Sequence, residues 1–250
     1  MKFIIALFRF IAFALVSIAT IVYYWSTFIF FGGSIERGFR IRAKYIAVML
    51  RVLNVHIKFY GHLPPKNFNG FIVANHRSYF DPVAILRDVD AVTVSKSQVS
   101  RWPIVGAGAK IVGVIWVSRE EKDSRKAARD KMLELVKKGY AVLIFPEGTS
   151  HASEKMLPLR NATFEMAAEN KFPVLPVAIE YDEPGYAFIG KETFVPHFFK
   201  CFGKWKTTIG LYFGKPLINS DAEQLKLAAV NEIDKQIPFL RKEIGYKEEF

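Results

Sequence analysis

The chain has 250 residues, of which 51% are hydrophobic and 15% aromatic. This composition excludes an intrinsically disordered chain, and the length fits one sizeable core with a short appendage. Lysine and arginine number 35 against 24 aspartate and glutamate, a formal net charge of +11, which favours nucleic acid, anionic lipid, phosphorylated substrates or an acidic carrier as partners. The single cysteine, Cys201, excludes an intrachain disulfide and fits a reducing cytosolic environment.

The N-terminal segment predicts attachment to a membrane. Residues 10–35 contain no charged side chain, and about 20 apolar residues are enough to cross the hydrocarbon core. The run is too long for a signal peptide and ends without a clean cleavage site. Two geometries are open: a spanning helix, or a helical hairpin that breaks at Gly32-Gly33 and continues as an amphipathic basic helix over residues 34–54. Basic residues are more numerous after the run than before it, which predicts a membrane protein with its bulk on the cytoplasmic side.

From Val55 onward, strand-like and helix-like patterns alternate. Apolar or β-branched runs predict strands at 71–74, 92–94, 111–117, 140–145, 174–181 and 207–213. Charged, helix-forming stretches predict helices at 120–138 and 160–170, and Ser220-x-x-Glu223 resembles a capping box that opens a C-terminal helix. Pro176 favours an edge or irregular position for its strand. The expected fold is α/β: a single domain with a mixed sheet flanked by helices over residues 55–250, preceded by a membrane anchor over residues 1–54.

A histidine and a carboxylate share one short loop, Asn75-His76-Arg77-Ser78-Tyr79-Phe80-Asp81. A carboxylate bonded to one ring nitrogen fixes the tautomer and leaves the other nitrogen as a base. Such a base activates the hydroxyl of a substrate directly, so no serine nucleophile is required. The loop also has a structural interpretation. Asp81 precedes Pro82, a pair typical of the first two positions of a helix, and His76 is then an ordinary loop histidine.

A second polar loop, Phe145-Pro146-Glu147-Gly148-Thr149, follows the apolar strand expected at 140–145. Loops after strands often carry function, and glycine lets a backbone amide come close to a ligand. The alternative is an ordinary turn with Glu147 on the surface. Together the two loops indicate a base that deprotonates an alcohol and a second surface that holds the substrate.

The histidine loop resembles the NHxxxxD signature of the glycerolipid acyltransferases, especially the 1-acylglycerol-3-phosphate acyltransferases. Three further blocks of that family have counterparts here in the same order, at Gly113–Arg119, Phe145–Thr149 and Val174–Ile179, and the stretch from Lys96 to Gly106, with Trp102-Pro103, is also similar. The resemblance covers roughly residues 60–180, and four blocks in order are much more specific than any one of them. One departure stands out: Ser150 occupies the place of the arginine that usually ends the third block.

The resemblance implies acyl transfer from a thioester donor, acyl-CoA or acyl carrier protein, to the free hydroxyl of lysophosphatidic acid, giving phosphatidic acid. His76 is the expected general base and Asp81 the residue that orients it. The resemblance further implies a membrane-lipid environment and these substrate-binding residues: Arg119, Glu147, Gly148, Thr149 and Arg160, the last as a substitute cation. We expect no metal site, since the five histidines lack ligand spacing. We also expect no cofactor and no nucleic-acid partner.

Three other functions are open. The loss of the arginine at Ser150 favours an acceptor other than lysophosphatidic acid, and relatives that acylate lyso-ornithine lipid can carry a similar serine. A membrane hydrolase would use water in place of the acceptor, although the chain has no Gly-x-Ser-x-Gly elbow. A non-catalytic membrane lipid-binding protein is the alternative from a different class, and the intact pair of His76 and Asp81 weighs against it.

Overall fold

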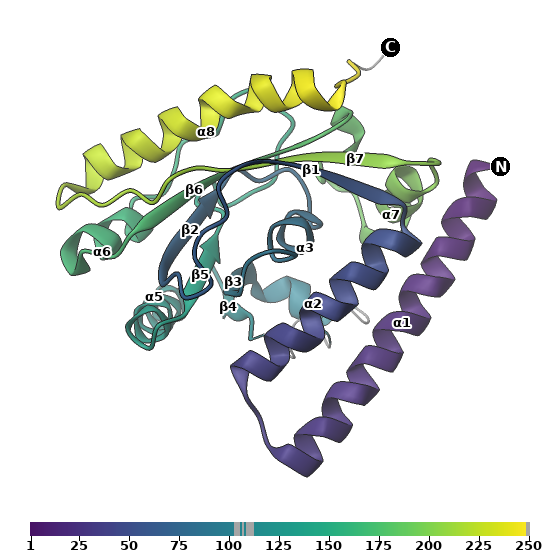
Figure 1. The fold of residues 1–250 in the computed structure, drawn as a ribbon, viewed down its shortest axis with the longest axis horizontal. Helices are drawn as coiled ribbons and strands as arrows, with labels where there is room; N and C mark the ends of the chain where they lie inside the picture. The colour runs from purple at the N-terminus through teal and green to yellow at the C-terminus, as the bar shows by residue number, and fades with distance from the viewer. Residues whose placement is uncertain (103–105, 107, 109–112, 249–250) are drawn as a thin grey trace.

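The computed structural model describes residues 1–102, 106, 108 and 113–248 (Figure 1). Predictions that involve Pro103, Ile111 and Val112 lie outside the described residues. The described chain forms a seven-stranded sheet with the order β1-β7-β6-β2-β5-β3-β4. Its strands are β1 (Val55–Gly61), β2 (Gly70–Ala74), β3 (Ala91–Lys96), β4 (Ile115–Val117), β5 (Ala141–Ile144), β6 (Val174–Tyr181) and β7 (Thr207–Phe213). The β6–β7 pair is antiparallel and the other pairs are parallel, so the predicted mixed sheet is confirmed.

Helices cover both faces of this sheet. The helices are α1 (Lys2–Phe31), α2 (Ile35–Val52), α3 (Asp81–Ile85), α5 (Lys122–Lys137), α6 (Ala162–Asn170), α7 (Phe194–Phe202) and α8 (Ala222–Ile244), with 3-10 turns η1 (Ser97–Arg101) and η2 (Pro184–Tyr186). Helices α1, α2, α3 and α7 contribute to the hydrophobic cluster on one face, and α5, α6 and α8 to the cluster on the other (Figure 1). The predicted flanking of the sheet by helices is therefore confirmed.

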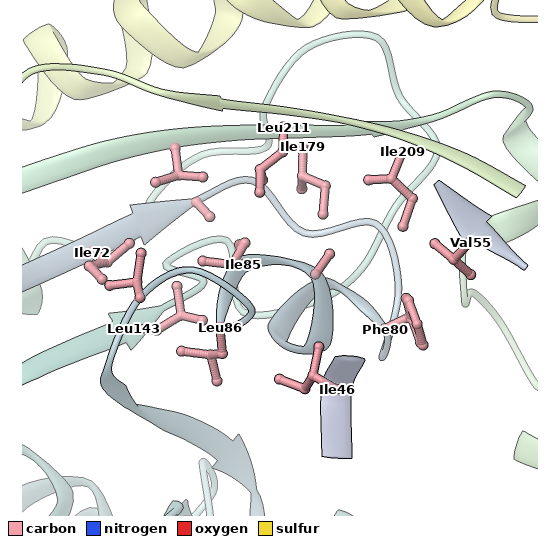
Figure 2. Close-up of a cluster of buried hydrophobic side chains, with 14 of the residues drawn as sticks. Ile46, Val55, Ile72, Phe80, Ile85, Leu86, Leu143, Ile179, Ile209 and Leu211 are labelled. Atoms are coloured by element: carbon pink, nitrogen blue, oxygen red, sulfur yellow. The ribbon is translucent and has the colours of Figure 1, made fainter. Parts of the chain in front are cut away.

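Strand β2 shows how the sequence builds the two core layers. Phe71 and Val73 pack with the α5, α6 and α8 side, whereas Ile72 and Ala74 pack with the α3 side. All four side chains are fully buried, as expected for a central strand covered on both faces. Figure 2 shows Ile72 of this strand in the cluster on the α3 side, together with Ile85 of α3. This arrangement fixes the end of β2, where the histidine loop begins.

Pro176 favoured an edge or irregular position, and of these two the edge position is wrong. Strand β6 lies inside the sheet, between β2 and β7. The carbonyl of Pro176 accepts from the Gly214 amide at 2.9 Å. Because the nitrogen and the carbonyl of a strand residue point to the same side, the proline nitrogen, which has no N–H, also faces the segment that contains Gly214. The ladder with β7 starts only at the next residue, where Val177 pairs with Phe213. The proline is tolerated because it stands just beyond the end of that ladder.

The predicted break at Gly32-Gly33 is confirmed, and the N-terminal segment forms a helical hairpin. Helix α1 ends at Phe31 and Gly32 takes a φ of 70°, a conformation that favours glycine. Helices α1 and α2 then lie next to each other (Figure 1), and Ser17 on α1 bonds Tyr45 on α2 at 2.9 Å. Among the described residues, α1 is the helix that is long enough and apolar enough to cross a membrane, judged by length and composition.

The predicted capping box at Ser220 is displaced by one residue. Helix α8 begins at Ala222, and the carboxylate of Asp221 caps it by accepting from the amides of Glu223 at 2.9 Å and Gln224 at 3.1 Å. A carboxylate next to the helix start competes successfully with the serine hydroxyl because it also interacts with the helix dipole.

Candidate active site

The loop between β2 and α3 holds a histidine–carboxylate pair. The Nδ1 atom of His76 donates to Oδ2 of Asp81 at 2.8 Å, since an ionised carboxylate only accepts. The imidazole also stacks on the ring of Phe145, with centroids 4.3 Å apart. The side chain of His76 is 21% exposed, whereas that of Asp81 is 0% exposed. With Nδ1 occupied, Nε2 is the nitrogen available to act as a base.

Asp81 does not serve as the cap of helix α3. Its Oδ2 accepts from the amides of Arg77 at 2.6 Å and Ser78 at 2.8 Å, and its Oδ1 accepts from the hydroxyl of Tyr181 at 2.7 Å. The residue at the cap position is Phe80, which provides no side-chain hydrogen bond. The interpretation of Asp81 as the cap of the helix is therefore wrong. The carboxylate turns back into its own loop, where it also accepts from the ring of His76.

Glu147 joins the second polar loop to the histidine loop. Its Oε1 accepts from the His76 amide at 2.7 Å, and its Oε2 accepts from the Leu157 amide at 2.7 Å and pairs with the ring of His151. The His151 amide donates in turn to the His76 carbonyl at 3.1 Å. The Glu147 side chain is 0% exposed, so the alternative of a surface turn is wrong. Its carboxylate is engaged with protein groups, which favours positioning of the loop over direct contact with a substrate.

A cavity of about 550 Å³ gathers the other residues proposed to bind the substrate. Its lining consists of Lys96, Gln98, Arg119, Glu120, Glu147, Gly148, Thr149 and Arg160. The Arg160 guanidinium lies over Gly148: a Cβ added there would meet guanidinium atoms at 3.1 Å, and the φ of Gly148 is +79°. Both observations explain why this loop uses glycine. Lys96, at the end of β3, belongs to the same cavity.

The cations in this cavity are electrostatically costly to hold together. Burial lowers the pKa of Lys96, and the charges of Arg119 and Arg160 lower it further. Burial likewise lowers the pKa of Arg119, with Arg160 adding to the effect and Glu120 opposing it. Like charges at short range destabilise one another, and a bound anion would relieve this repulsion. The cavity therefore suits a phosphate.

A larger cavity of about 670 Å³ joins the histidine to this cationic pocket and to an apolar space. His76 lines it together with Lys96, Arg119 and Arg160. Its apolar wall comes from helices α1, α2, α3 and α7, through residues that include Phe13, Ile21, Ile46, Met49, Val83 and Phe198. The geometry brings the histidine, the cationic pocket and an apolar chamber into contact with one another. Within the part of the chain that the structure describes, no group of His, Cys, Asp and Glu is suited to hold a metal ion.

The family model described as "Acyltransferase" matches residues 56–180, half of the chain. The chain belongs to the acyltransferase family. The pair of His76 and Asp81 and the cationic pocket with Arg160 both lie within this match. The family resemblance inferred from the four sequence blocks is thereby confirmed.

Two curated relatives illustrate the acyltransferases that the chain resembles. It is 28% identical over 142 residues to a 1-acyl-sn-glycerol-3-phosphate acyltransferase of Neisseria gonorrhoeae, covering 53% of this chain and 56% of that protein. It is also 28% identical over 162 residues to a lyso-ornithine lipid O-acyltransferase of Pseudomonas aeruginosa, covering 62% of each. The chain thus spans rather more than half the length of these relatives.

The fold is similar to that of a solved acyltransferase. The crystal structure of the 1-acyl-sn-glycerophosphate acyltransferase PlsC from Thermotoga maritima matches with a TM-score of 0.62 and 23% identity. The match covers 93% of this chain and 98% of that one. The shared fold therefore includes the N-terminal hairpin as well as the sheet.

The acyltransferase pattern and this chain differ at Ser150. The serine hydroxyl donates to the Phe188 carbonyl, so it ties the second polar loop to the segment after η2. Arg160 lies in the cationic pocket and supplies a guanidinium there. Its backbone amide donates to the Pro146 carbonyl at 3.1 Å, which anchors it against the same loop.

Sequence analysis missed Tyr181 and the burial of Arg77. Tyr181 contacts an aspartate one hundred positions earlier, and no local pattern signals such a contact. Arg77, the next residue after His76, is buried and its Nη2 donates to Glu180 at 3.1 Å. Only the pairing of β2 with β6 brings these residues together.

Proposed function

We propose that the chain transfers an acyl group from a thioester donor to the free hydroxyl of lysophosphatidic acid, giving phosphatidic acid. One observation carries this proposal: the base His76 lines the same cavity as Lys96, Arg119 and Arg160. A phosphate held by these cations would place a glycerol hydroxyl of the same molecule within reach of the imidazole. Membership of the acyltransferase family supports the reaction type.

In the proposed mechanism, Nε2 of His76 takes the proton of the acceptor hydroxyl while its oxygen attacks the thioester carbonyl. Asp81 holds the ring by its 2.8 Å bond and stabilises the imidazolium that forms. Collapse of the tetrahedral intermediate breaks the C–S bond, and the proton passes from the imidazolium to the departing thiolate. General-base assistance of this kind is worth about 10²–10⁴-fold in rate.

The two ends of the acceptor have matching surfaces in the cavity. Arginine binds phosphate through paired N–H donors, which suits Arg119 and Arg160. Gly148 and Thr149 offer a close backbone and a hydroxyl beside them. The acyl chain would lie against the apolar wall, where each buried methylene contributes about 0.8 kcal/mol. The donor, acyl-CoA or acyl carrier protein, is anionic, and Arg125 and Arg129 of α5 line the same cavity.

Residues 1–54 would anchor the catalytic region, residues 55–250, at the cytoplasmic face of a membrane. Helix α1 exposes many large apolar side chains, among them Phe3, Ile4, Phe8, Ile29 and Phe30. Such a surface fits lipid rather than water. Acceptor and product both partition into membranes, so anchoring brings the cavity to its substrate.

A second candidate is acylation of another lysolipid, such as lyso-ornithine lipid. Ser150 stands where the family pattern has arginine, and the lyso-ornithine lipid O-acyltransferase of Pseudomonas aeruginosa is 28% identical to this chain, as is the 1-acyl-sn-glycerol-3-phosphate acyltransferase of Neisseria gonorrhoeae. The three cations of the pocket favour the phosphorylated acceptor.

The test is an assay of the full chain with acyl-CoA or acyl carrier protein and a panel of acceptors: lysophosphatidic acid, lysophosphatidylcholine and lyso-ornithine lipid. We expect lysophosphatidic acid to be preferred and His76→Ala to lower turnover by about 10²–10⁴-fold. The matched control is His56→Ala, which replaces an exposed histidine on β1 and should leave turnover unchanged.

Other outcomes would contradict the proposal. Near wild-type turnover by His76→Ala would refute the assignment of the base. Release of free fatty acid without an acylated acceptor would identify a hydrolase, and lipid binding without any turnover would identify a non-catalytic protein.

A further inference from the structure

The structure assigns a positioning role to Tyr181: we propose that its hydroxyl fixes the carboxylate of Asp81 against the ring of His76. Tyr181 comes from β6, a strand separate from the loop that carries the catalytic pair. The expected effect on kcat rests on the proposed function, whereas the contact between Tyr181 and Asp81 does not depend on it.

The hydrogen bonds to Asp81 are divided unequally between its two oxygens. Oδ2 accepts from Nδ1 of His76 and from the amides of Arg77 and Ser78, at 2.6–2.8 Å. Oδ1 accepts from the Tyr181 hydroxyl at 2.7 Å. Because the Asp81 side chain is fully buried, a carboxylate oxygen that lost its donor would remain unsatisfied in the protein interior, which is unfavourable.

Tyr181 is itself held rigidly in the position that this role requires. It is 1% exposed and stacks on Tyr186, with ring centroids 5.0 Å apart and planes at 17°. Burial raises its pKa well above the ordinary value, and the charge of Asp81 and the hydrogen bond to it raise it further. The hydroxyl therefore stays protonated and donates a hydrogen bond to Oδ1.

Tyr181 acts through Asp81 rather than on the substrate. It lines neither of the two cavities described above. With the Oδ1 bond removed, the carboxylate keeps its donors on Oδ2 but loses the contact that prevents rotation about its Cβ–Cγ bond. The Nδ1–H bond of His76 then becomes less well aligned, which weakens the base in the transition state while substrate binding is preserved.

The test compares Tyr181→Phe with Tyr186→Phe in the full-length protein. The two rings are stacked partners with the same burial, but the Tyr186 hydroxyl bonds Thr207 Oγ1 at 2.7 Å and the Cys201 carbonyl at 3.2 Å. We expect Tyr181→Phe to lower kcat by about tenfold or more, as loss of a hydrogen bond to a charged group should. The KM for donor and acceptor should stay within about twofold, since Tyr181 contacts neither. Tyr186→Phe should leave both parameters near wild type.

A second readout does not depend on activity. In protein with ¹⁵N-labelled histidine, the Nδ1 proton of His76 gives an NMR signal that reports its bond to Asp81. We expect this signal to shift and to exchange faster with water in Tyr181→Phe, and to be unchanged in Tyr186→Phe. If the phenylalanine variant fails to fold, 3-fluorotyrosine at position 181 keeps the hydroxyl as a stronger donor and should shift the same signal.

Two results would overturn the inference: equal loss of kcat in both phenylalanine variants, or an unshifted Nδ1 proton signal in the variant at position 181. A wild-type protein that transfers no acyl group would refute the proposed function instead, and the proton signal would still decide the role of Tyr181.

Discussion

Asp81 combines complete burial with four hydrogen bonds, three of them from its own loop. Burial alone would favour the neutral form of a carboxyl group, whereas donors favour the charged form. Two backbone amides, an imidazole and a tyrosine hydroxyl satisfy it here. All the hydrogen bonds that a buried carboxylate needs are therefore present in the interior, and in the proposed mechanism this group stabilises the imidazolium of His76. The ring of His76 remains partly exposed.

Arg119 provides a residue-scale test of the anion pocket. We expect Arg119→Ala to raise the KM for lysophosphatidic acid by about 10- to 100-fold, the effect of losing a charge-assisted hydrogen bond. The KM for zwitterionic lysophosphatidylcholine should change much less. Arg87→Ala serves as the control, because Arg87 pairs with Asp88 and lines neither cavity. Equal losses with both acceptors would argue against a phosphate contact.

Helix α1 is attached to the catalytic region by one buried cation and a set of aromatic rings. The Arg9 guanidinium donates to the carbonyls of Phe202 at 3.0 Å, Lys204 and Trp205 at 2.9 Å. These carbonyls follow the end of α7, where the helix dipole is negative and favours a cation. The Phe10 ring meets Phe198 with centroids 5.3 Å apart. Helix α1 also forms part of the wall of the larger cavity.

We expect Arg9→Ala to destabilise the fold by about 2 kcal/mol or more, since it leaves carbonyls at the end of α7 without their donor. Activity should fall with it, because α1 lines the cavity through residues such as Phe13 and Ile21. Thermal unfolding in detergent measures the effect. Arg40→Ala, which replaces an exposed arginine on α2, should change stability by less than about 0.5 kcal/mol. Equal effects of the two changes would show that Arg9 does not anchor α1.

At the scale of the whole molecule, both ends of the hairpin are tied to the catalytic region. The N-terminal turn of α1 contacts α7 through Phe3 and Phe199, with ring centroids 5.5 Å apart. Helix α2 leads directly into β1 at Val55. The start of α1 is bound to the catalytic region. We therefore expect the hairpin to enter one leaflet and return, rather than to place the two ends of α1 on opposite sides of the membrane.

This topology is testable because the chain has a single cysteine, which Cys201→Ala removes. Two cysteine substitutions are then introduced one at a time. Lys2→Cys reports on which side of the membrane α1 starts, and Lys215→Cys reports the side of the catalytic region. We expect a membrane-impermeant maleimide to label neither in intact cells and both after permeabilisation, as a cytoplasmic hairpin requires. Labelling of Lys2→Cys alone in intact cells would show that α1 crosses the bilayer.

Much of this architecture follows from local patterns, each contained within one segment of the chain. The β2, β5 and β7 runs are apolar and β-branched, and they became strands close to the predicted limits. The α5 segment ends at Lys137, one residue before the predicted limit, and Gly139 follows with a φ of 91°. The strand expected around Pro176 was misplaced in the sheet because a local propensity does not reveal where a neighbouring ladder begins.

Sequence by itself identified the residues of the candidate site, because the four blocks contain His76, Asp81 and Arg119 in a recognisable order. Tertiary structure alone decided which groups touch one another. Tyr181 reaches Asp81, and Glu147 turns inward to the His76 amide, because parallel pairing sets β6 and β5 on either side of β2. The physical reason is range: strand and helix patterns arise from neighbours in the chain, whereas hydrogen-bond partners across a sheet are chosen by how the whole core packs.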